Sequence, residues 1–270
     1  MNNHIIVSNV SDDSFALGVG YAHSQEIDIS DIIALKTFIN NEFCPRFLQD
    51  HVTEETLGHG LKGKSVYIVS THSAYHSRDE LAMRNYLIAS AAKENGAEFV
   101  ALVEPDLFYS AQDRGPRTID HPQVTDFASR EKFVGQPCSA EMYAQLLKTS
   151  GVDSVMTVHN HKPDVMRNIY EKVNPTGNSR KISSFLNLDI SPLIANYILR
   201  SGLVRLWNYG EHVGFVAPDD GAVDFVNRVR EFTGLHNSVM VNFKKTRHGQ
   251  RDVTVDFSED AELLKGRDIF

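Results

Sequence analysis

VDSVMTVHNHKPDV, residues 152–165, joins a short apolar run directly to a cluster of polar side chains. Residues 155–158 are mostly apolar and β-branched, which is typical of a buried strand. His159 and His161 follow at its carboxyl end, the place where ligands bind in open parallel sheets. Residues two apart in an extended segment point the same way, so the two imidazoles are expected to share one ligand. The alternative is that both simply face solvent.

The same alternation of apolar runs and helix-like stretches extends on both sides of this run. Further strands are predicted at residues 4–8, 65–70, 98–103, 213–217, 238–243 and 253–257, and another begins within 263–270. Helices are predicted over residues 29–47, 81–95, 139–150, 192–200 and 222–232, with Ser139 as an N-cap and Gly96 and Gly151 as stops. This βαβ alternation predicts an α/β fold whose parallel sheet carries helices on both faces.

Length and composition set the outer limits. A chain of 270 residues is enough for one large or two ordinary domains, and a hydrophobic content of 41% can supply a core. The net charge of -8 argues against a nucleic-acid binder, so any phosphate site must be built locally. No stretch reaches the roughly 20 apolar residues of a membrane helix. Without a basic apolar leader, and with only Cys44 and Cys138 as thiols, a cytoplasmic protein is expected.

Polar clusters follow four of the predicted strands. They are Gln112-Asp113-Arg114, His159 with His161, Asp219-Asp220-Gly221, and Lys245-Thr246-Arg247 in a basic loop over residues 244–251. Each cluster alone is typical of a solvated loop or a turn. Together they supply oxygen and nitrogen ligands for a hard cation and fixed positive charges, which is what phosphoryl transfer requires.

The order and spacing of these clusters resemble those of the ribose-phosphate diphosphokinases (phosphoribosyl-diphosphate synthetases) over residues 65–270. LFYSAQDR at 107–114 stands where that family has Phe-Gly-Tyr-Ala-Arg-Gln-Asp-Arg, and HNH at 159–161 stands for its Asp-Leu-His. LDISPLIANYI at 188–198 resembles the family linker, and APDDG at 217–221 its Ser-Pro-Asp-x-Gly. The Lys-Thr-Arg loop is matched by residues 245–247, and the strand lead after it by KGRDIF at 265–270.

The resemblance implies Mg²⁺-dependent transfer of diphosphate from ATP to the C1 hydroxyl of ribose 5-phosphate, with release of AMP. It implies two similar phosphoribosyltransferase-like (type I) domains with parallel-rich sheets flanked by helices, joined within residues 178–186. The first would span residues 1–182, with an insertion at about 118–137, and the second residues 183–270. It also implies a homo-oligomer, a dimer or larger.

The resemblance also implies roles for individual residues. His161 would act near the reacting phosphates of Mg–ATP, with His159 and Asp219 as further metal-site residues. Gln112, Asp113 and Arg114 would lie against the nucleotide, and Phe43 near its base. Asp219, Asp220 and Gly221 would bind the ribose phosphate, while Lys245 and Arg247 would close over the β-phosphorus.

Several positions depart from the family pattern. Ala111 replaces an arginine, His159 replaces an aspartate, and residues 43–47 lack the acids of the family's adenine motif. The acidic Gly-Gly-Thr phosphoribosyl loop would begin directly after Phe270, so the second domain is expected to be incomplete. These departures keep three alternatives open: a non-catalytic synthetase-associated subunit, a diphosphokinase with an altered ribosyl acceptor, and a metal-dependent hydrolase using His159, His161 and Asp164.

Overall fold

The computed structural model describes residues 3–49, 52–117, 125–175, 182–203, 205–247, 253–256 and 259–270. The chain divides into two compact units, Met1–Leu188 and Asp189–Phe270. β7 (Phe185–Leu188) belongs to the first unit, so it overlaps the linker predicted within 178–186. The domain boundary after residue 182 stays a prediction.

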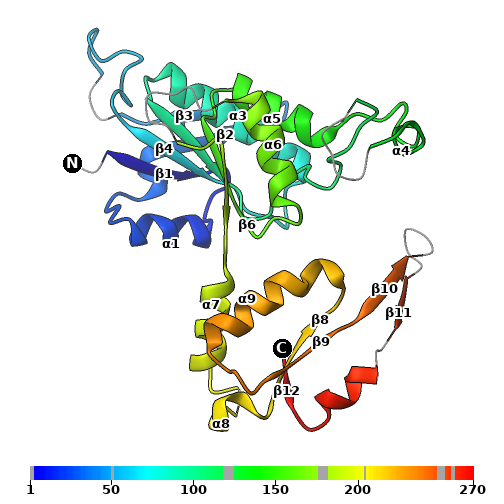
Figure 1. The fold of residues 1–270 in the computed structure, drawn as a ribbon. Helices are drawn as coiled ribbons and strands as arrows, with labels where there is room; N and C mark the ends of the chain where they lie inside the picture. The colour runs from blue at the N-terminus through cyan, green and yellow to red at the C-terminus, as the bar shows by residue number, and fades with distance from the viewer. Residues whose placement is uncertain are drawn as a thin grey trace. The chain divides into compact units, whose positions relative to one another are not determined.

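The first unit is built on a parallel sheet of five strands (Figure 1). Its order is β1 (His4–Ser8), β4 (Ser65–Val69), β5 (Phe99–Val103), β6 (Ser154–Val158) and β7. Ser8 lies opposite Val69, and Val69 opposite Val103, so the carboxyl ends of β1, β4 and β5 are level. The α/β fold class predicted from the sequence is confirmed.

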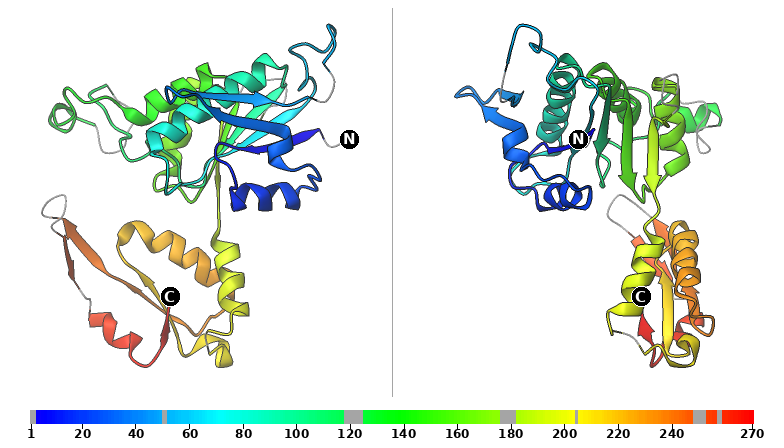
Figure 2. Two further views of the ribbon diagram at one scale, coloured as in Figure 1. Left: turned by 180° about the vertical axis from the view of Figure 1, so that it is seen from behind. Right: turned by 90° about the vertical axis from the view of Figure 1, so that its left-hand side faces the viewer.

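Helices cover both faces of this sheet, but unequally (Figures 1 and 2). α3 (Arg78–Glu94), α5 (Ser139–Thr149) and α6 (Pro163–Val173) bury the main core on one face. α1 (Ser14–Ala22) covers a smaller cluster on the other face, where Ala16 packs against Ile6 and Val69. Gly96 and Gly151 end α3 and α5 with positive φ angles of 88° and 101°, as predicted.

The helix predicted over residues 29–47 is wrong. Only α2 (Ile29–Ile32) is helical; β2 (Ile33–Thr37) and β3 (Phe43–Phe47) then form an antiparallel hairpin. Ile33 and Phe47 lie opposite each other and are both buried in the main core. The intervening turn contains Asn41 with a φ of 67°, a left-handed conformation that Asn tolerates. Burial alternates along β3, which is the strand period that the helical reading missed.

The start of α5 corrects a second prediction. Cys138, not Ser139, occupies the N-cap, and no side chain caps the helix. The amide of Ala140 instead donates to the carbonyl of Gln112 at 3.1 Å, so the loop after β5 takes over the capping. The predicted insertion contains α4 (Phe127–Glu131), while residues 118–124 lie outside the described residues.

The second unit has a three-stranded parallel sheet in the order β12 (Asp268–Ile269), β8 (Val213–Ala217) and β9 (Val239–Asn242). α7 (Ser191–Arg200) and α9 (Val223–Thr233) enclose its core around Phe215. Short helical segments complete it: α8 (Trp207–Gly210), η1 (Asp220–Ala222) and η2 (Glu259–Leu264).

The predicted basic loop is partly a strand. β10 (Lys244–Arg247) pairs antiparallel with β11 (Val253–Asp256), and residues 248–252 lie outside the described residues. β10 begins almost directly after β9 ends. Because the residues of β10 are polar and charged, the sequence indicated a loop there. Lys245 lies within a β-strand and not in a loop.

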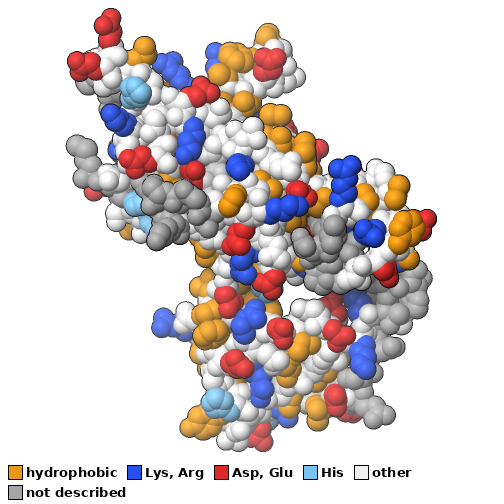
Figure 3. Space-filling model, turned by 45° about the horizontal axis from the view of Figure 1, so that its top comes forward, with side chains coloured by type: hydrophobic (Ala, Val, Ile, Leu, Met, Phe, Trp, Pro, Cys, Tyr) orange, Lys and Arg blue, Asp and Glu red, His pale blue; other side chains and the backbone are white. Residues whose placement is uncertain are grey.

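Within the described ranges, no helix combines the length and the apolar character that crossing a membrane requires. Lys and Arg side chains are interspersed with Asp and Glu side chains on the face drawn in Figure 3. This mixture fits the expectation that a phosphate group is recognised by a few locally placed cations.

Candidate functional site

The loops after β5 and β6 come together in the first unit. Asp113, only 3% exposed, lies between two cations. Its carboxylate oxygens are 3.3 Å from Arg114 Nε and 3.8 Å from Lys162 Nζ. Thr157 Oγ1 also donates to the carbonyl of Pro105 at 3.2 Å. Because β5 and β6 are neighbours in the parallel sheet, two clusters far apart in the sequence share one edge.

Within this loop, the amide of Gln112 is turned toward the protein. Its Nε2 donates to the carbonyl of Arg114 at 2.9 Å and to Gln136 Oε1 at 3.2 Å. The guanidinium of Arg114 stacks 5.2 Å from the ring centroid of Phe133. Residues 133 and 136 belong to the predicted insertion, so the insertion supports the Gln112-Asp113-Arg114 triplet directly.

His159 and His161 are both exposed, but the predicted extended path between them is wrong. His159 has a left-handed φ of 44°, and its amide donates to Leu188 O at 3.1 Å. The next amide, that of Asn160, donates to Asn187 Oδ1 at 2.7 Å. The side chains of His159 and His161 therefore need not point the same way.

The metal-hydrolase arrangement is not assembled among the residues that the structure describes. They contain no group of three or more His, Cys, Asp or Glu side chains placed to hold a metal ion. Asp164, the third candidate ligand, is paired instead with Arg167 at 2.8 Å.

Phe43 serves the packing of the hairpin. It lies on β3, is partly buried against the main core, and its ring lies 4.5 Å beneath the guanidinium of Arg84. Its role near a nucleotide base stays a prediction.

In the second unit, the ends of three strands converge. Asp219, just after β8, has one carboxylate oxygen on the amide of Gly221 at 3.1 Å and the other 3.8 Å from Lys245 Nζ on β10. Asp220 accepts a 2.6 Å hydrogen bond from Asn242, the last residue of β9. Asn242 was missed, because a single Asn at the end of a strand carries no sequence signal. Arg247 lies on β10, but its side chain is outside the described part of the chain.

This cluster combines hard oxygen donors with one cation. Carboxylate and amide oxygens can accept from sugar hydroxyls or hold Mg²⁺, which is usually bound by one or two carboxylates while keeping several waters. The donor set of Asp219, Asp220 and Asn242 therefore fits that ion. Lys245 balances the charge of Asp219 and could exchange that carboxylate for a phosphate oxygen.

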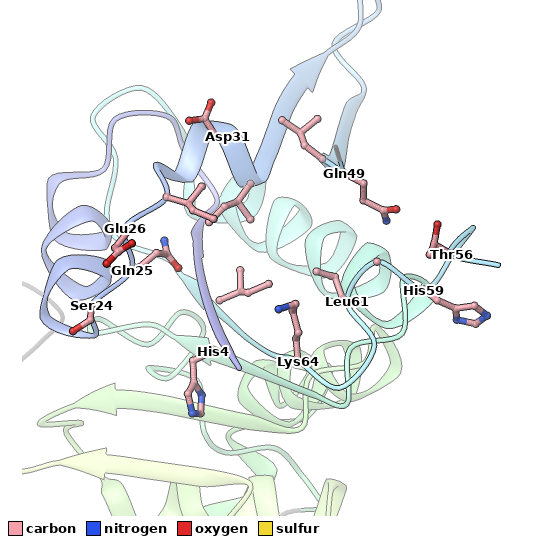
Figure 4. Close-up of a pocket in the computed structure, with 15 residues that line it drawn as sticks. His4, Ser24, Gln25, Glu26, Asp31, Gln49, Thr56, His59, Leu61 and Lys64 are labelled. Carbon is pink, nitrogen blue, oxygen red and sulfur yellow. The ribbon is translucent and has the colours of Figure 1, made fainter. Parts of the chain in front are cut away.

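A separate pocket of about 860 Å³ lies at the opposite end of the sheet in the first unit (Figure 4). Its lining comes from the start of β1, the segment after α1, and the turn that leads into β4. His4, Gln25, His59 and Lys64 are among its polar lining residues. None of the predicted site residues lines it.

A further polar group was missed at the carboxyl end of β5. Glu104 is 0% exposed and is surrounded by hydrogen-bond donors. Burial raises the pKa of its carboxyl group to about 8, against the opposing effect of those donors. The only sequence signal was an acid directly after the apolar run FVALV.

No family model matches the chain, but it is similar in sequence to curated proteins of one name. A ribose-phosphate pyrophosphokinase 1 of Streptococcus pyogenes serotype M1 is 27% identical over 192 residues, which cover 69% of this chain and 48% of the relative. The corresponding protein of Streptococcus agalactiae serotype III is 25% identical over 230 residues, covering 78% and 59%. The chain thus spans about half the length of the curated relatives it matches.

A solved structure agrees at the level of the fold. The crystal structure of phosphoribosylpyrophosphate synthetase from Mycobacterium smegmatis superimposes with a TM-score of 0.62 at 18% identity. The match covers 95% of this chain and 67% of the other.

Proposed function

We propose, from its similarity to ribose-phosphate pyrophosphokinases, that this chain serves the transfer of diphosphate from ATP to the C1 hydroxyl of ribose 5-phosphate. The products would be phosphoribosyl diphosphate and AMP. The observation that carries the proposal is the ion pair between Lys245 on β10 and Asp219 in the turn after β8. Bound Mg²⁺ would neutralise charge on the phosphates of ATP.

The first unit would supply the nucleotide side. Arg114 and Lys162 offer cations at the carboxyl edge of the sheet, and buried Asp113 fixes where they lie. The exposed imidazole of His161 can donate a hydrogen bond to a phosphate oxygen from the adjoining loop. Phosphoryl transfer requires hydrogen-bond donors and cations held in fixed positions around the phosphates, because positioning and charge stabilisation provide most of the catalysis.

The second unit carries side chains suited to a ribose phosphate and to the charge of a phosphoryl group. Asp219 and Asp220 would hold ribose hydroxyls or Mg²⁺, and the amide of Gly221 continues the turn. Lys245 and Arg247 would move to the β-phosphoryl oxygens as charge builds on them. Contacts made mainly in the transition state lower the barrier without tightening ATP binding.

The direct test is AMP release by the purified chain from ATP, ribose 5-phosphate and Mg²⁺. The proposal expects AMP only when all three are present. AMP release that is unaffected by omitting ribose 5-phosphate would indicate hydrolysis and contradict it. The same preparation examined by sedimentation at micromolar concentration tests the proposed homo-oligomer, which a monomer would refute.

One observation favours a second function, that of a non-catalytic subunit associated with a synthetase. The side-chain amide of Gln112 donates to Arg114 O and Gln136 Oε1 and so faces the protein, and position 111 carries alanine instead of a cation. A chain that makes no AMP, yet changes the activity of a complete synthetase with which it co-purifies, would support this alternative.

A further inference from the structure

Glu104 lies at the root of the loop that carries Asp113 and Arg114. Its carboxyl oxygens accept from the amide of Phe108 at 2.9 Å and from the hydroxyl of Tyr143 at 3.0 Å and 3.2 Å. Ser70 Oγ and Asn85 Nδ2 each donate to it at 3.2 Å. One fully buried side chain therefore links β4, α3, α5 and the loop's first turn.

The network continues to the first strand. Asn9, directly after β1, donates from Nδ2 to Ser70 Oγ at 2.9 Å and to Asn85 Oδ1 at 2.8 Å. Asn9, Ser70 and Asn85 are each 0–1% exposed. The level carboxyl ends of β1, β4 and β5 are thus joined by side chains in the dry interior, where each such bond is stronger than in water.

The loop that begins at Glu104 follows a constrained path. Tyr109 has a φ of 55°, a left-handed conformation that is unfavourable for a bulky side chain. Phe108 beside it is 1% exposed, the hydroxyl of Tyr109 donates to Asp79, and the ring of Tyr109 packs 5.2 Å from that of Tyr143. Such a conformation persists only where the surroundings over-determine it. The bond from the Phe108 amide to Glu104 fixes the backbone one residue earlier.

Burying an acid without a cationic partner is costly. An apolar side chain of similar volume would avoid that cost but would leave the Phe108 amide and the Tyr143 hydroxyl buried without an acceptor. A carboxyl group does what an apolar side chain cannot: its oxygens accept from a loop amide and from side chains of three other segments at once.

We propose that Glu104 is a positioning residue, whose bonds to the Phe108 amide and the Tyr143 hydroxyl set the path of residues 105–114 and so the placement of Asp113 and Arg114. The statement that this path matters for nucleotide binding rests on the proposed function. The statement about the loop itself does not.

The test compares three variants of the full chain by peptide-resolved hydrogen exchange and by ATP binding. E104Q keeps the shape but places an amide against donors, and Y143F removes one hydroxyl while keeping the ring. D106N is the matched control, since Asp106 is a carboxylate of the same loop that is exposed and paired with Arg78. We expect residues 105–114 to exchange about tenfold faster in E104Q, less so in Y143F, and unchanged in D106N.

The outcomes separate the two claims. Faster exchange confined to residues 105–114, with ATP binding weakened by about tenfold, supports both. Unchanged exchange there, or an equal rise over β6 and α6, would overturn the positioning role. If the wild-type chain binds no ATP, the proposed nucleotide site fails, and the exchange pattern still decides whether Glu104 positions the loop. If E104Q does not fold, a local effect in Y143F supports the proposal and an unchanged loop contradicts it.

Discussion

Lys245 Nζ lies 3.8 Å from Asp219 Oδ2, so β10 approaches the turn after β8. Both side chains are about one-third exposed, at 30% and 39%, so water screens the pair and its contribution to stability is small. A weak ion pair in a cluster that contains a second acid and an amide is easily exchanged. The contact therefore contributes little to holding the fold together.

Lys245→Ala is expected to lower AMP formation by about 10²–10³-fold while changing ATP affinity little, since its phosphate contact would form mainly in the transition state. Initial rates with ribose 5-phosphate and Mg²⁺, together with direct ATP titration, measure both quantities. Lys244→Ala, on the neighbouring residue of β10, is the matched control and should retain activity. Equal rates in the Lys245 variant and the wild type would remove this residue from the mechanism.

Arg247→Ala should likewise lower the rate of AMP formation while changing ATP affinity little. The resemblance places Arg247, like Lys245, against the negative charge of the β-phosphoryl group. The double variant with Lys245→Ala tests whether the two act together. Losses that multiply would indicate independent contacts, whereas a double variant no worse than either single one would indicate a single unit.

His161→Ala is expected to reduce turnover by about 10²-fold, the effect of losing one electrostatic contact in the transition state. His159→Ala should have less effect, because the histidine of the matched motif stands at position 161, whereas His159 replaces an aspartate. The comparison of the two variants under the same assay decides the assignment. A silent His161 variant beside an inactive His159 variant would reverse it.

The sequence predicted the sheet better than it predicted the hairpin. Residues 4–8 and 213–217 form strands with the bounds expected, because short β-branched runs between turn signals have few alternatives. Residues 29–47 were misread, since Ile29, Ile32 and Ile33 fit a helical face as well as a helix–strand junction. The decision rests on the turn around Asn41 and on packing against α3, which is a tertiary effect.

The candidate site divides in the same way. The four clusters were visible because polar residues gather in the sequence after apolar runs. The pairings between them were not, because Lys162 meets Asp113 only once β5 and β6 are known to be neighbours. Glu104 escaped notice for a different reason: a lone acid after a strand looks like the start of a solvated loop, and its burial depends on α3 and α5 closing over it.

The pH dependence of stability should carry the signature of Glu104. Its pKa is raised by burial to about 8 in the folded chain, from an ordinary value near 4.5, and the exposed carboxylate of Asp106 adds to the effect. Tyr86, Tyr143 and Tyr170 also face this region, and the pKa of each is raised, so they stay neutral over the same range. The folded state therefore holds one more proton than the unfolded chain between pH 4.5 and about 8.

The sign follows from that extra proton. The stabilisation is complete below the unfolded pKa and is lost as the pH rises through the folded one. The free energy of unfolding should then fall with pH across this window, by at most about 1.4 kcal/mol per pH unit from this group. Urea unfolding of the wild type and of E104Q, measured from pH 5 to 9, isolates the contribution as the difference between the two curves. E104Q should be the less pH-dependent of the two below pH 8. D106N should keep most of the wild-type dependence, because Asp106 makes only a minor contribution to the raised pKa of Glu104. A difference that stays constant with pH would show that Glu104 does not change its protonation on unfolding.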